Sequence, residues 1–276
     1  MDKVRQVELA NAFLARHRGP PMLLLPNVWD AMSAGIFAAA GFDALATTSG
    51  GVAWALGYPD GEHAPWSEVL AATARIVRAA RVAVTADIET GYGATPAEVA
   101  AHVAEIIQSG VVGINLEDSV HGKLRSIEDA SARLAAAREA ALREGVPLVI
   151  NARCDVFHLA HGEKTSPLAP AVERCKAYFA AGADCVYPFG LRDSQTIAAF
   201  VKAVDGPVNI TGRPGMPNAQ VFETMGVARI TIASAPTLAV MSAIQGLAKE
   251  LRAGSGFEML AASLTRSEAQ KLFQSK

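Results

Sequence analysis

Eight short apolar runs, each followed by a longer alanine-rich segment of helical period, constrain the fold of this chain more than any other sequence feature. The runs lie at residues 22–26, 44–49, 82–89, 113–118, 148–153, 185–189, 208–211 and 229–233. Strands that alternate with helices in this way form the βαβ units of a parallel sheet. Eight units without a long linker favour one closed (β/α)8 barrel of the TIM type over an open doubly wound sheet, which usually has fewer strands.

Glycines and capping residues support the same alternation. Thr95, Pro96 and Glu98 supply an N-cap, a first-turn proline and a capping-box acid, so a helix is expected to start near residue 96. A left-handed residue that ends the preceding helix is expected a few residues before several strands, at Gly41, Gly110, Gly145, Gly182 and Gly226.

The domain prediction is one barrel over residues 1–252, followed by a helical extension over residues 253–276. A Gly/Ser-rich stretch just after residue 252 resembles a hinge, and the segment beyond it has an amphipathic pattern. A barrel is complete without this extension. We therefore expect it to pack on a neighbouring subunit, or otherwise to belong to the same domain.

Composition and charge exclude several classes of protein. About 51% of the residues are hydrophobic and 19% are charged, which excludes a disordered chain. The net charge is −2 and the basic residues are scattered, so no nucleic-acid partner is expected. No apolar run is long enough for a membrane span, and the charged N-terminus does not resemble a signal peptide. A cytoplasmic protein is expected, with its three cysteines as small buried residues.

Polar side chains keep one face on successive predicted strands. Residues two apart on a strand share a face, and in a barrel those at the carboxyl ends of the strands reach the site built by the following loops. The polar pairs with this spacing are Thr47 and Ser49, Asp87 and Glu89, Asn115 and Glu117, Asn151 and Arg153, and Asn209 and Thr211.

The carboxylates among these residues outnumber the single arginine. Buried charges need partners, so the acids must meet a counter-ion or a ligand. Mg²⁺ is the economical candidate, because it favours oxygen ligands and is often held by one or two direct carboxylates, here Asp87 first. Arg153 has a planar fork that can bind a substrate carboxylate. The alternative is an internal ion-pair network between the acids and Arg153.

Five short motifs occur in order along the chain: SGG at 49–51, GYPD at 57–60, DIETGYG at 87–93, NLED at 115–118 and NAR at 151–153. With these motifs the chain resembles the isocitrate lyase/phosphoenolpyruvate mutase superfamily, from about Pro26 to Ser234. The resemblance implies a Mg²⁺-dependent α/β barrel, with Mn²⁺ as a substitute, that acts on C–C or P–C bonds next to an α-oxo carboxylate. It also implies a homodimer or homotetramer formed through a swapped C-terminal helix.

The resemblance implies roles for individual residues. Asp87 would bind Mg²⁺, and Asp60, Glu89 and Glu117 would reach the ion directly or through water. The implied substrate contacts are Thr47, Ser49, Gly50, Gly51, Asp87, Arg153, Asn209 and Thr211. Ser49, Gly50, Glu117 and Arg153 would carry the catalysis, in which Mg²⁺ and loop amides stabilise an enolate.

Two segments depart from the lyase pattern. Residues 119–125 lack the cysteine that lyases of this superfamily carry in a loop after the fourth strand, and the usual glutamate after the sixth strand is replaced within residues 187–190. In the altered loop His121 and Lys123 are candidate gate residues, and an imidazole titrates near neutral pH.

The leading functional hypothesis is a Mg²⁺-dependent lyase or decarboxylase that acts on a small 2-oxo or 2-hydroxy di- or tricarboxylate through an enolate. One alternative is a P–C bond enzyme similar to phosphonopyruvate hydrolase or phosphoenolpyruvate mutase. A second is a phosphosugar enzyme that holds phosphate at residues 211–215. A third is a barrel that binds a 2-oxo acid without converting it.

Overall fold

The computed structural model of the protein describes residues 2–160, 166–254, 256–261 and 264–274. All eight predicted strands are present, and the first is split by Pro26 into two short pieces. The barrel strands are β1 (Leu23–Leu25), β2 (Asn27–Val28), β3 (Ala44–Thr47), β4 (Ala83–Asp87), β5 (Gly113–Glu117), β8 (Val149–Cys154), β9 (Cys185–Pro188), β10 (Asn209–Thr211) and β11 (Arg229–Thr231).

The strands close into a barrel. One parallel run has the order β2-β3-β4-β5-β8-β9, and a second has the order β1-β11-β10. A parallel bridge between Val186 and Val208 joins β9 to the second run, and Pro26 alone separates β1 from β2. Because each end of the first run is linked to the second run, the fold is a closed (β/α)8 barrel and the open doubly wound sheet is wrong.

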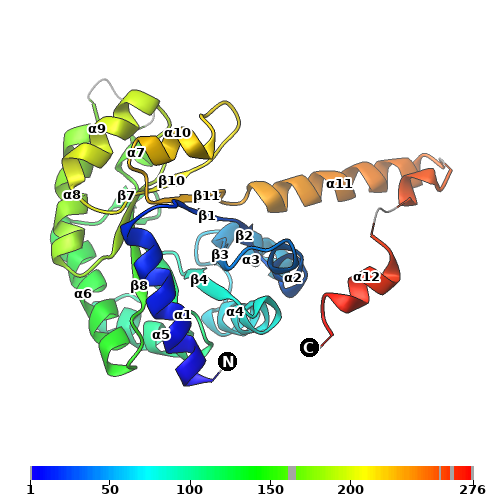
Figure 1. Ribbon diagram of the computed structural model, residues 1–276, viewed down its shortest axis with the longest axis horizontal. Helices are drawn as coiled ribbons and strands as arrows, with labels where there is room; N and C mark the ends of the chain where they lie inside the picture. Colours follow the sequence, from blue (N-terminus) through cyan, green and yellow to red (C-terminus); the bar gives the residue numbers. More distant parts are fainter. Residues whose placement is uncertain (1, 161–165, 255, 262–263, 275–276) are drawn as a thin grey trace.

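Helices surround the barrel (Figure 1). The longer ones beside the strands are α1 (Lys3–Ala15), α2 (Ala31–Ala39), α3 (Ser49–Leu56), α4 (Trp66–Ala80), α5 (Pro96–Gln108), α6 (Ile127–Arg143), α8 (Leu168–Ala180) and α9 (Ser194–Val204). Shorter ones are η1 (Arg16–Arg18), α7 (Val156–Leu159) and α10 (Ala219–Thr224). The predicted capping box starts α5, with Thr95 as N-cap. The five glycines predicted to end helices all have positive φ.

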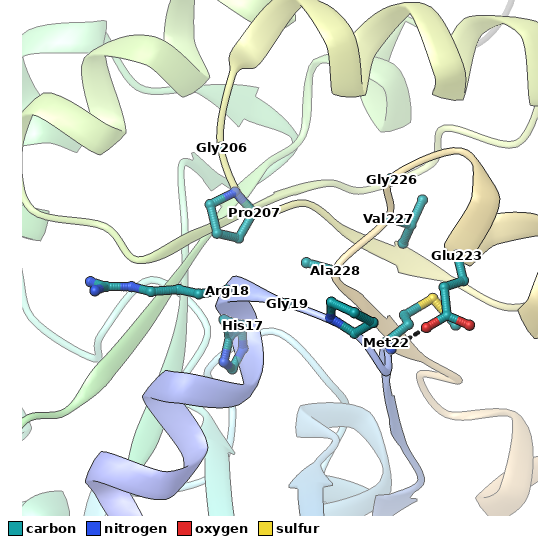
Figure 2. A pocket seen from close by; sticks show the side chains of 11 residues that line it. His17, Arg18, Gly19, Met22, Gly206, Pro207, Glu223, Gly226, Val227 and Ala228 are labelled. Carbon is teal, nitrogen blue, oxygen red and sulfur yellow. Dashed lines mark hydrogen bonds between the residues drawn. The ribbon is translucent and has the colours of Figure 1, made fainter.

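Helix α1 covers the amino-terminal end of the barrel. The Gln6 side chain donates hydrogen bonds to the carbonyls of Ile107 (2.7 Å) and Val111 (2.8 Å). A cavity of about 590 Å³ lies at this same end, lined by residues that precede β1, β10 and β11, including Arg18 and Glu223 (Figure 2). None of the predicted site residues lines it. The chemistry predicted from the sequence therefore belongs to the opposite end.

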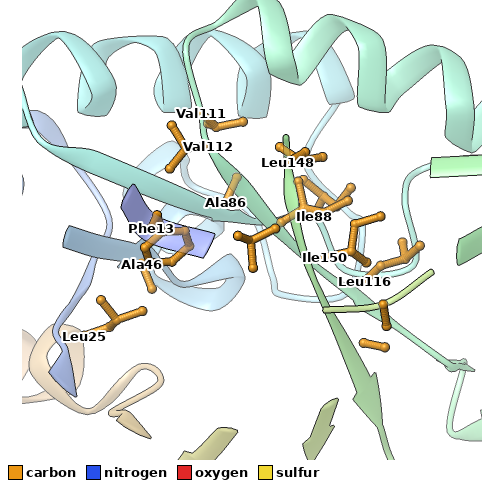
Figure 3. Close-up of a cluster of buried hydrophobic side chains, with 14 of the residues drawn as sticks. Phe13, Leu25, Ala46, Ala86, Ile88, Val111, Val112, Leu116, Leu148 and Ile150 are labelled. Carbon is orange, nitrogen blue, oxygen red and sulfur yellow. The ribbon is translucent and has the colours of Figure 1, made fainter. Parts of the chain in front are cut away.

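Apolar side chains on the outer face of the strands form the core between barrel and helices. Val84, Ala86 and Ile88, which alternate with the polar residues of their strand, are at most 1% exposed. Ile88 gathers with Leu116 and Ile150 from the two next strands along the sheet (Figure 3). Burying side chains of this size contributes about 1.5–3 kcal/mol each. The same alternation that builds this core turns the polar residues inward.

The C-terminal segment extends away from the barrel. α11 (Ala235–Arg252) projects from it, and η2 (Glu258–Leu260) and α12 (Arg266–Lys271) follow (Figure 1). The predicted hinge after residue 252 includes Ser255, which lies outside the described residues. No helix among the described residues is both long and apolar enough to cross a lipid bilayer.

Candidate active site

The strand register brings the predicted polar residues into two levels at the carboxyl end of the barrel. Asp87 pairs with Asn115, and Asn115 pairs with Asn151, across β4, β5 and β8. Glu117 pairs with Arg153 one level above. Asn115, Glu117 and Arg153 line cavities at this end and Asn151 donates a hydrogen bond to Asn115, so these polar residues of β5 and β8 face inward.

A cavity of about 290 Å³ opens at these levels. Of the predicted site residues, Ser49, Asp60, Asp87 and Arg153 line it. The sequence interpretation did not assign a site role to the other residues that line it, which are Asn27, Thr48, Asn115, His158, Tyr187, Phe189, Thr231, Ala233 and Ser234. Strand parity places only Asn115 of these on the inward face of its strand, and none of the others has a formal charge that would distinguish it in the sequence.

Asp87 is a half-buried acid that lines this cavity. Its carboxylate accepts a hydrogen bond from the Ser49 N–H (3.2 Å), and its own N–H donates to the Thr47 hydroxyl (2.8 Å). Burial raises the pKa of Asp87 and nearby Asp60 raises it further, whereas Arg153 and the Ser49 hydrogen bonds oppose the shift. A Cβ at Gly50 would lie only 3.0 Å from the Asp60 carboxylate, so glycine allows Asp60 to approach.

Glu89 reaches the site by a different route from the one predicted. β4 ends at Asp87, and Glu89 has left-handed backbone with φ of 52°, so strand parity does not orient its side chain. Its carboxylate accepts hydrogen bonds from the Tyr92 hydroxyl and the Glu62 N–H, both at 2.8 Å. Burial, together with the nearby acids Asp87, Asp60 and Glu62, raises the pKa of Glu89 to about 7.

Glu89 lines a second cavity of about 520 Å³. Glu117, His121, Arg153 and His158 line it as well, and Asp87 does not. Arg153 and His158 therefore line both cavities. The prediction that Glu89 shares a strand face with Asp87 is wrong, because the strand ends two residues before it.

Arg153 is held by two carboxylates. Its Nη1 lies 2.6 Å from Glu117, and its Nε and Nη2 donate to the two oxygens of Asp155 at 2.6 and 3.0 Å. Burial disfavours the charged guanidinium, but Glu117 and Asp155 outweigh this cost and the pKa of Arg153 is raised. Burial raises the pKa of Glu117 well above its usual range, and Arg153 opposes that shift.

Arg153 therefore forms an internal ion-pair network with acids, which was the alternative to a metal site that the sequence left open. Asp155 occupies the fork that was predicted to bind a substrate carboxylate. Sequence analysis missed Asp155, although it stands two residues after Arg153 and continues the same spacing. Asp155 is identified if the alternation of Asn151 and Arg153 is extended by one step past residue 153, where the predicted strand ends.

Five predicted contacts lie outside the lining of both cavities: Thr47, Gly50, Gly51, Asn209 and Thr211. The Thr211 hydroxyl is hydrogen-bonded to the Tyr187 hydroxyl, and Asn209 is hydrogen-bonded to the Thr231 hydroxyl at 3.3 Å. A Cβ at Gly51 would lie 2.6 Å from the Thr237 hydroxyl, so close packing requires glycine there. Thr47, Thr211 and Asn209 thus contact the site through hydrogen bonds to Asp87, Tyr187 and Thr231, which line the first cavity.

The loop after β5 is a tight hairpin. β6 (Ser119–Val120) and β7 (Lys123–Leu124) are antiparallel, and His121 and Gly122 form the turn with φ of 49° and 73°. Two positive φ values are typical of a type I′ turn. His121 lines the 520 Å³ cavity, whereas Lys123 is exposed and lines neither cavity. The Ser119 hydroxyl donates to Asp155 at 2.5 Å, which fixes the base of the hairpin.

The donor set of the first cavity fits a hydrated Mg²⁺. Among the described residues, no three His, Cys, Asp or Glu side chains form a ready metal cage. Mg²⁺ does not require one, because it retains several waters and often binds one or two carboxylates. Asp87 and nearby Asp60 supply oxygen donors beside the cavity, and burial leaves the negative charge of Asp87 poorly compensated. A divalent cation would compensate it.

The family model described as phosphoenolpyruvate phosphomutase matches residues 13–252. The chain belongs to this family. An uncharacterized protein of Mycobacterium tuberculosis is 37% identical over 92% of both chains. The oxaloacetate decarboxylase of Ectopseudomonas mendocina is 28% identical over 94% of this phosphomutase-family chain and 89% of its own.

Solved structures agree with this assignment. A protein of Burkholderia cenocepacia described as a putative lyase/mutase has a TM-score of 0.90 and 33% identity, over 99% of this chain and 98% of its own. The structure of 2,3-dimethylmalate lyase, described as a member of the PEP mutase/isocitrate lyase superfamily, has a TM-score of 0.82 and 26% identity over 96% and 94%. The superfamily predicted from the five motifs and the barrel fold are confirmed.

Proposed function

We propose that this phosphomutase-family protein is a Mg²⁺-dependent carbon–carbon lyase, most simply a decarboxylase, of a small 2-oxo or 2-hydroxy dicarboxylate. The observation that supports this most is the half-buried Asp87 carboxylate, close to Asp60 and directly beside the start of α3. The oxaloacetate decarboxylase among the relatives acts on a compound of this class.

The start of α3 supplies groups that stabilise negative charge on the substrate. Its N-cap, Thr48, makes no side-chain hydrogen bond to the helix, and two glycines follow Ser49. N–H groups at a helix start favour an anionic oxygen, such as the oxo oxygen of an acid that becomes an enolate. Bound Mg²⁺ would add Lewis-acid stabilisation of the same developing charge. Asp87 would hold the ion, with Asp60 as a further oxygen donor.

A cysteine proton donor of the lyase type has no counterpart here. All three cysteines are buried, and none lines either cavity. Burial also raises the pKa of Cys175 and Cys185, which keeps these thiols protonated and unreactive. Protonation of an enolate therefore falls to an imidazole or to water, and His158 lines both cavities while His121 lines one. Decarboxylation releases CO2 and not a second organic acid, so it requires no cysteine to protonate such a product.

The test is a screen of oxo acids with Mg²⁺, in which pyruvate formation from oxaloacetate is followed with and without EDTA. We expect turnover that EDTA abolishes and that added Mg²⁺ or Mn²⁺ restores. Turnover of phosphonopyruvate alone would support the P–C bond alternative. Calorimetric binding of oxalate or 2-oxoglutarate without turnover of any oxo acid would support the non-catalytic alternative. Turnover that resists EDTA would contradict the metal proposal.

We also propose that α11 packs on a second copy of the chain in a homodimer or homotetramer. Only Thr237 of the residues described in α11 is buried, and a stripe of apolar side chains along the helix is exposed: Leu238 (50%), Met241 (47%), Ile244 (60%) and Leu251 (46%). An exposed apolar stripe of this length usually marks an interaction surface. Intersubunit packing would cover it.

Substitution of Ile244 by Asp should shift the protein to a smaller mass class in light scattering, because an unpaired carboxylate is costly inside an apolar interface. Truncation after Gly254 should weaken the oligomer as well. The matched control is Leu142→Asp, which places the same charge at a leucine of α6 that is 71% exposed. Unchanged mass for both the Ile244 variant and the truncation would contradict the proposal.

A further inference from the structure

One arginine beside Phe189 has no partner of opposite charge among the residues that the structure describes. Arg213 lies in the loop after β10, and its guanidinium carbon is 5.7 Å from the centre of the Phe189 ring. In the described part of the chain its guanidinium forms no ion pair and no hydrogen bond to another residue. Phe189 lines the cavity that holds Asp87.

Arg153 contacts the same ring but differs in its partners. Its guanidinium carbon is 4.0 Å from the Phe189 centre, and Glu117 and Asp155 already neutralise it. The two arginines are thus both placed by Phe189, as guanidinium groups commonly stack on aromatic rings. Of this pair, only Arg213 has donors that no described residue occupies, so they are available for an anion.

The backbone around Arg213 is fixed. The Gly212 N–H donates to the Thr231 carbonyl (2.8 Å), which ties the loop to β11, and the Met216 N–H donates to the Arg213 carbonyl (3.2 Å). Pro214 restricts the backbone further. A guanidinium presented from such a loop loses less conformational entropy when it binds a ligand.

Charge near the cavity is distributed unevenly. Asp60 and Asp87 line the cavity, and Glu117 lies beside it. The negative charge of these acids repels an anionic substrate, so the 2-oxo carboxylate can bind at this end only together with a metal cation. A second carboxylate on the substrate needs another cation, because Asp155 occupies the fork of Arg153. We propose that Arg213, placed against Phe189, binds the second carboxylate of a dicarboxylate substrate. This inference rests on the proposed function and names the group that selects for its substrate class.

The experiment compares wild type with Arg213→Gln by calorimetry in Mg²⁺. The probes are oxalate and pyruvate, which lack a distal carboxylate, and 2-oxo dicarboxylates of four to six carbons. We expect wild type to prefer a dicarboxylate over pyruvate, and Arg213→Gln to weaken dicarboxylate binding about tenfold to a hundredfold, since hydrogen bonds to charged groups have this magnitude. Oxalate and pyruvate affinities should stay unchanged, and Arg213→Lys should restore part of the preference.

The matched control is Arg18→Gln, which removes one arginine charge at the opposite end of the barrel, in the cavity of Figure 2. It should leave every affinity unchanged. Equal affinity of wild type for pyruvate and dicarboxylates overturns the assignment. So does an equal loss for all probes in Arg213→Gln. If no oxo acid is turned over but the dicarboxylate preference depends on Arg213, the lyase proposal fails and the Arg213 assignment stands.

Discussion

Substitution of Asp87 by Asn should abolish Mg²⁺-dependent turnover, with kcat/KM reduced about 10³-fold or more, equivalent to about 4 kcal/mol of lost transition-state stabilisation. Asn has the same shape but no charge, so it keeps the packing and loses the attraction for a divalent cation. The reduction should be measured as pyruvate formation from the best oxo acid of the screen. Undiminished turnover would remove Asp87 from the proposed metal site.

The same variant should remain folded, and this distinguishes a functional loss from a structural one. Burial raises the pKa of Asp87 in the folded state, so its ionisation destabilises the fold and stability is lost as the pH rises through that raised pKa. In Mg²⁺-free buffer at pH 8, Asp87→Asn should therefore melt at or above the wild-type temperature. Added Mg²⁺ should raise the melting temperature of wild type only.

A matched control is Asp43→Asn, because Asp43 is an exposed acid whose carboxylate pairs with Arg16, far from the cavity. An exposed pair contributes at most about 1 kcal/mol. This control should keep both turnover and the Mg²⁺-dependent rise in melting temperature. A loss of turnover in the control would mean that the assay reports stability rather than metal binding.

The barrel and the polar residues on its strands could be predicted because both depend on periodic patterns. A strand alternates strictly, so the position of Asn115, Glu117, Asn151 and Arg153 relative to their apolar neighbours determines which face they take. Helix starts such as Thr95 are equally local, because a cap and its helix are a few residues apart. These features need no knowledge of distant contacts.

The parts that could not be predicted depend on irregular backbone or on partners distant in sequence. Glu89 leaves the strand pattern because its backbone is left-handed, and the turn at His121 depends on two successive positive φ values. Asp60 stands in a loop, so only the resemblance identified it. The position of Arg213 beside Phe189 joins two loops distant in sequence, which no periodicity expresses.

Substitution of Arg153 by Met should destabilise the protein by about 3–5 kcal/mol at pH 8, the magnitude measured when one partner of a buried ion pair is removed. Met retains most of the apolar contact with Phe189, but it leaves Glu117 and Asp155 without their counter-charge. The free energy of unfolding should be measured by urea titration in Mg²⁺-free buffer. Arg153→Lys, the matched control, keeps the charge and should cost less.

The pH dependence of this loss identifies its cause. Arg153 holds down the pKa of Glu117, which burial raises, so removing Arg153 raises that pKa further. A raised folded-state pKa gives stability that is lost as the pH rises, so Arg153→Met should be destabilised more at pH 8 than at pH 5.5. The double variant with Glu117→Gln should recover part of the loss at pH 8. An equal loss of unfolding free energy at both pH values would instead assign the role of Arg153 to its packing against Phe189. In that case its ion pairs with Glu117 and Asp155 would not stabilise this end of the barrel.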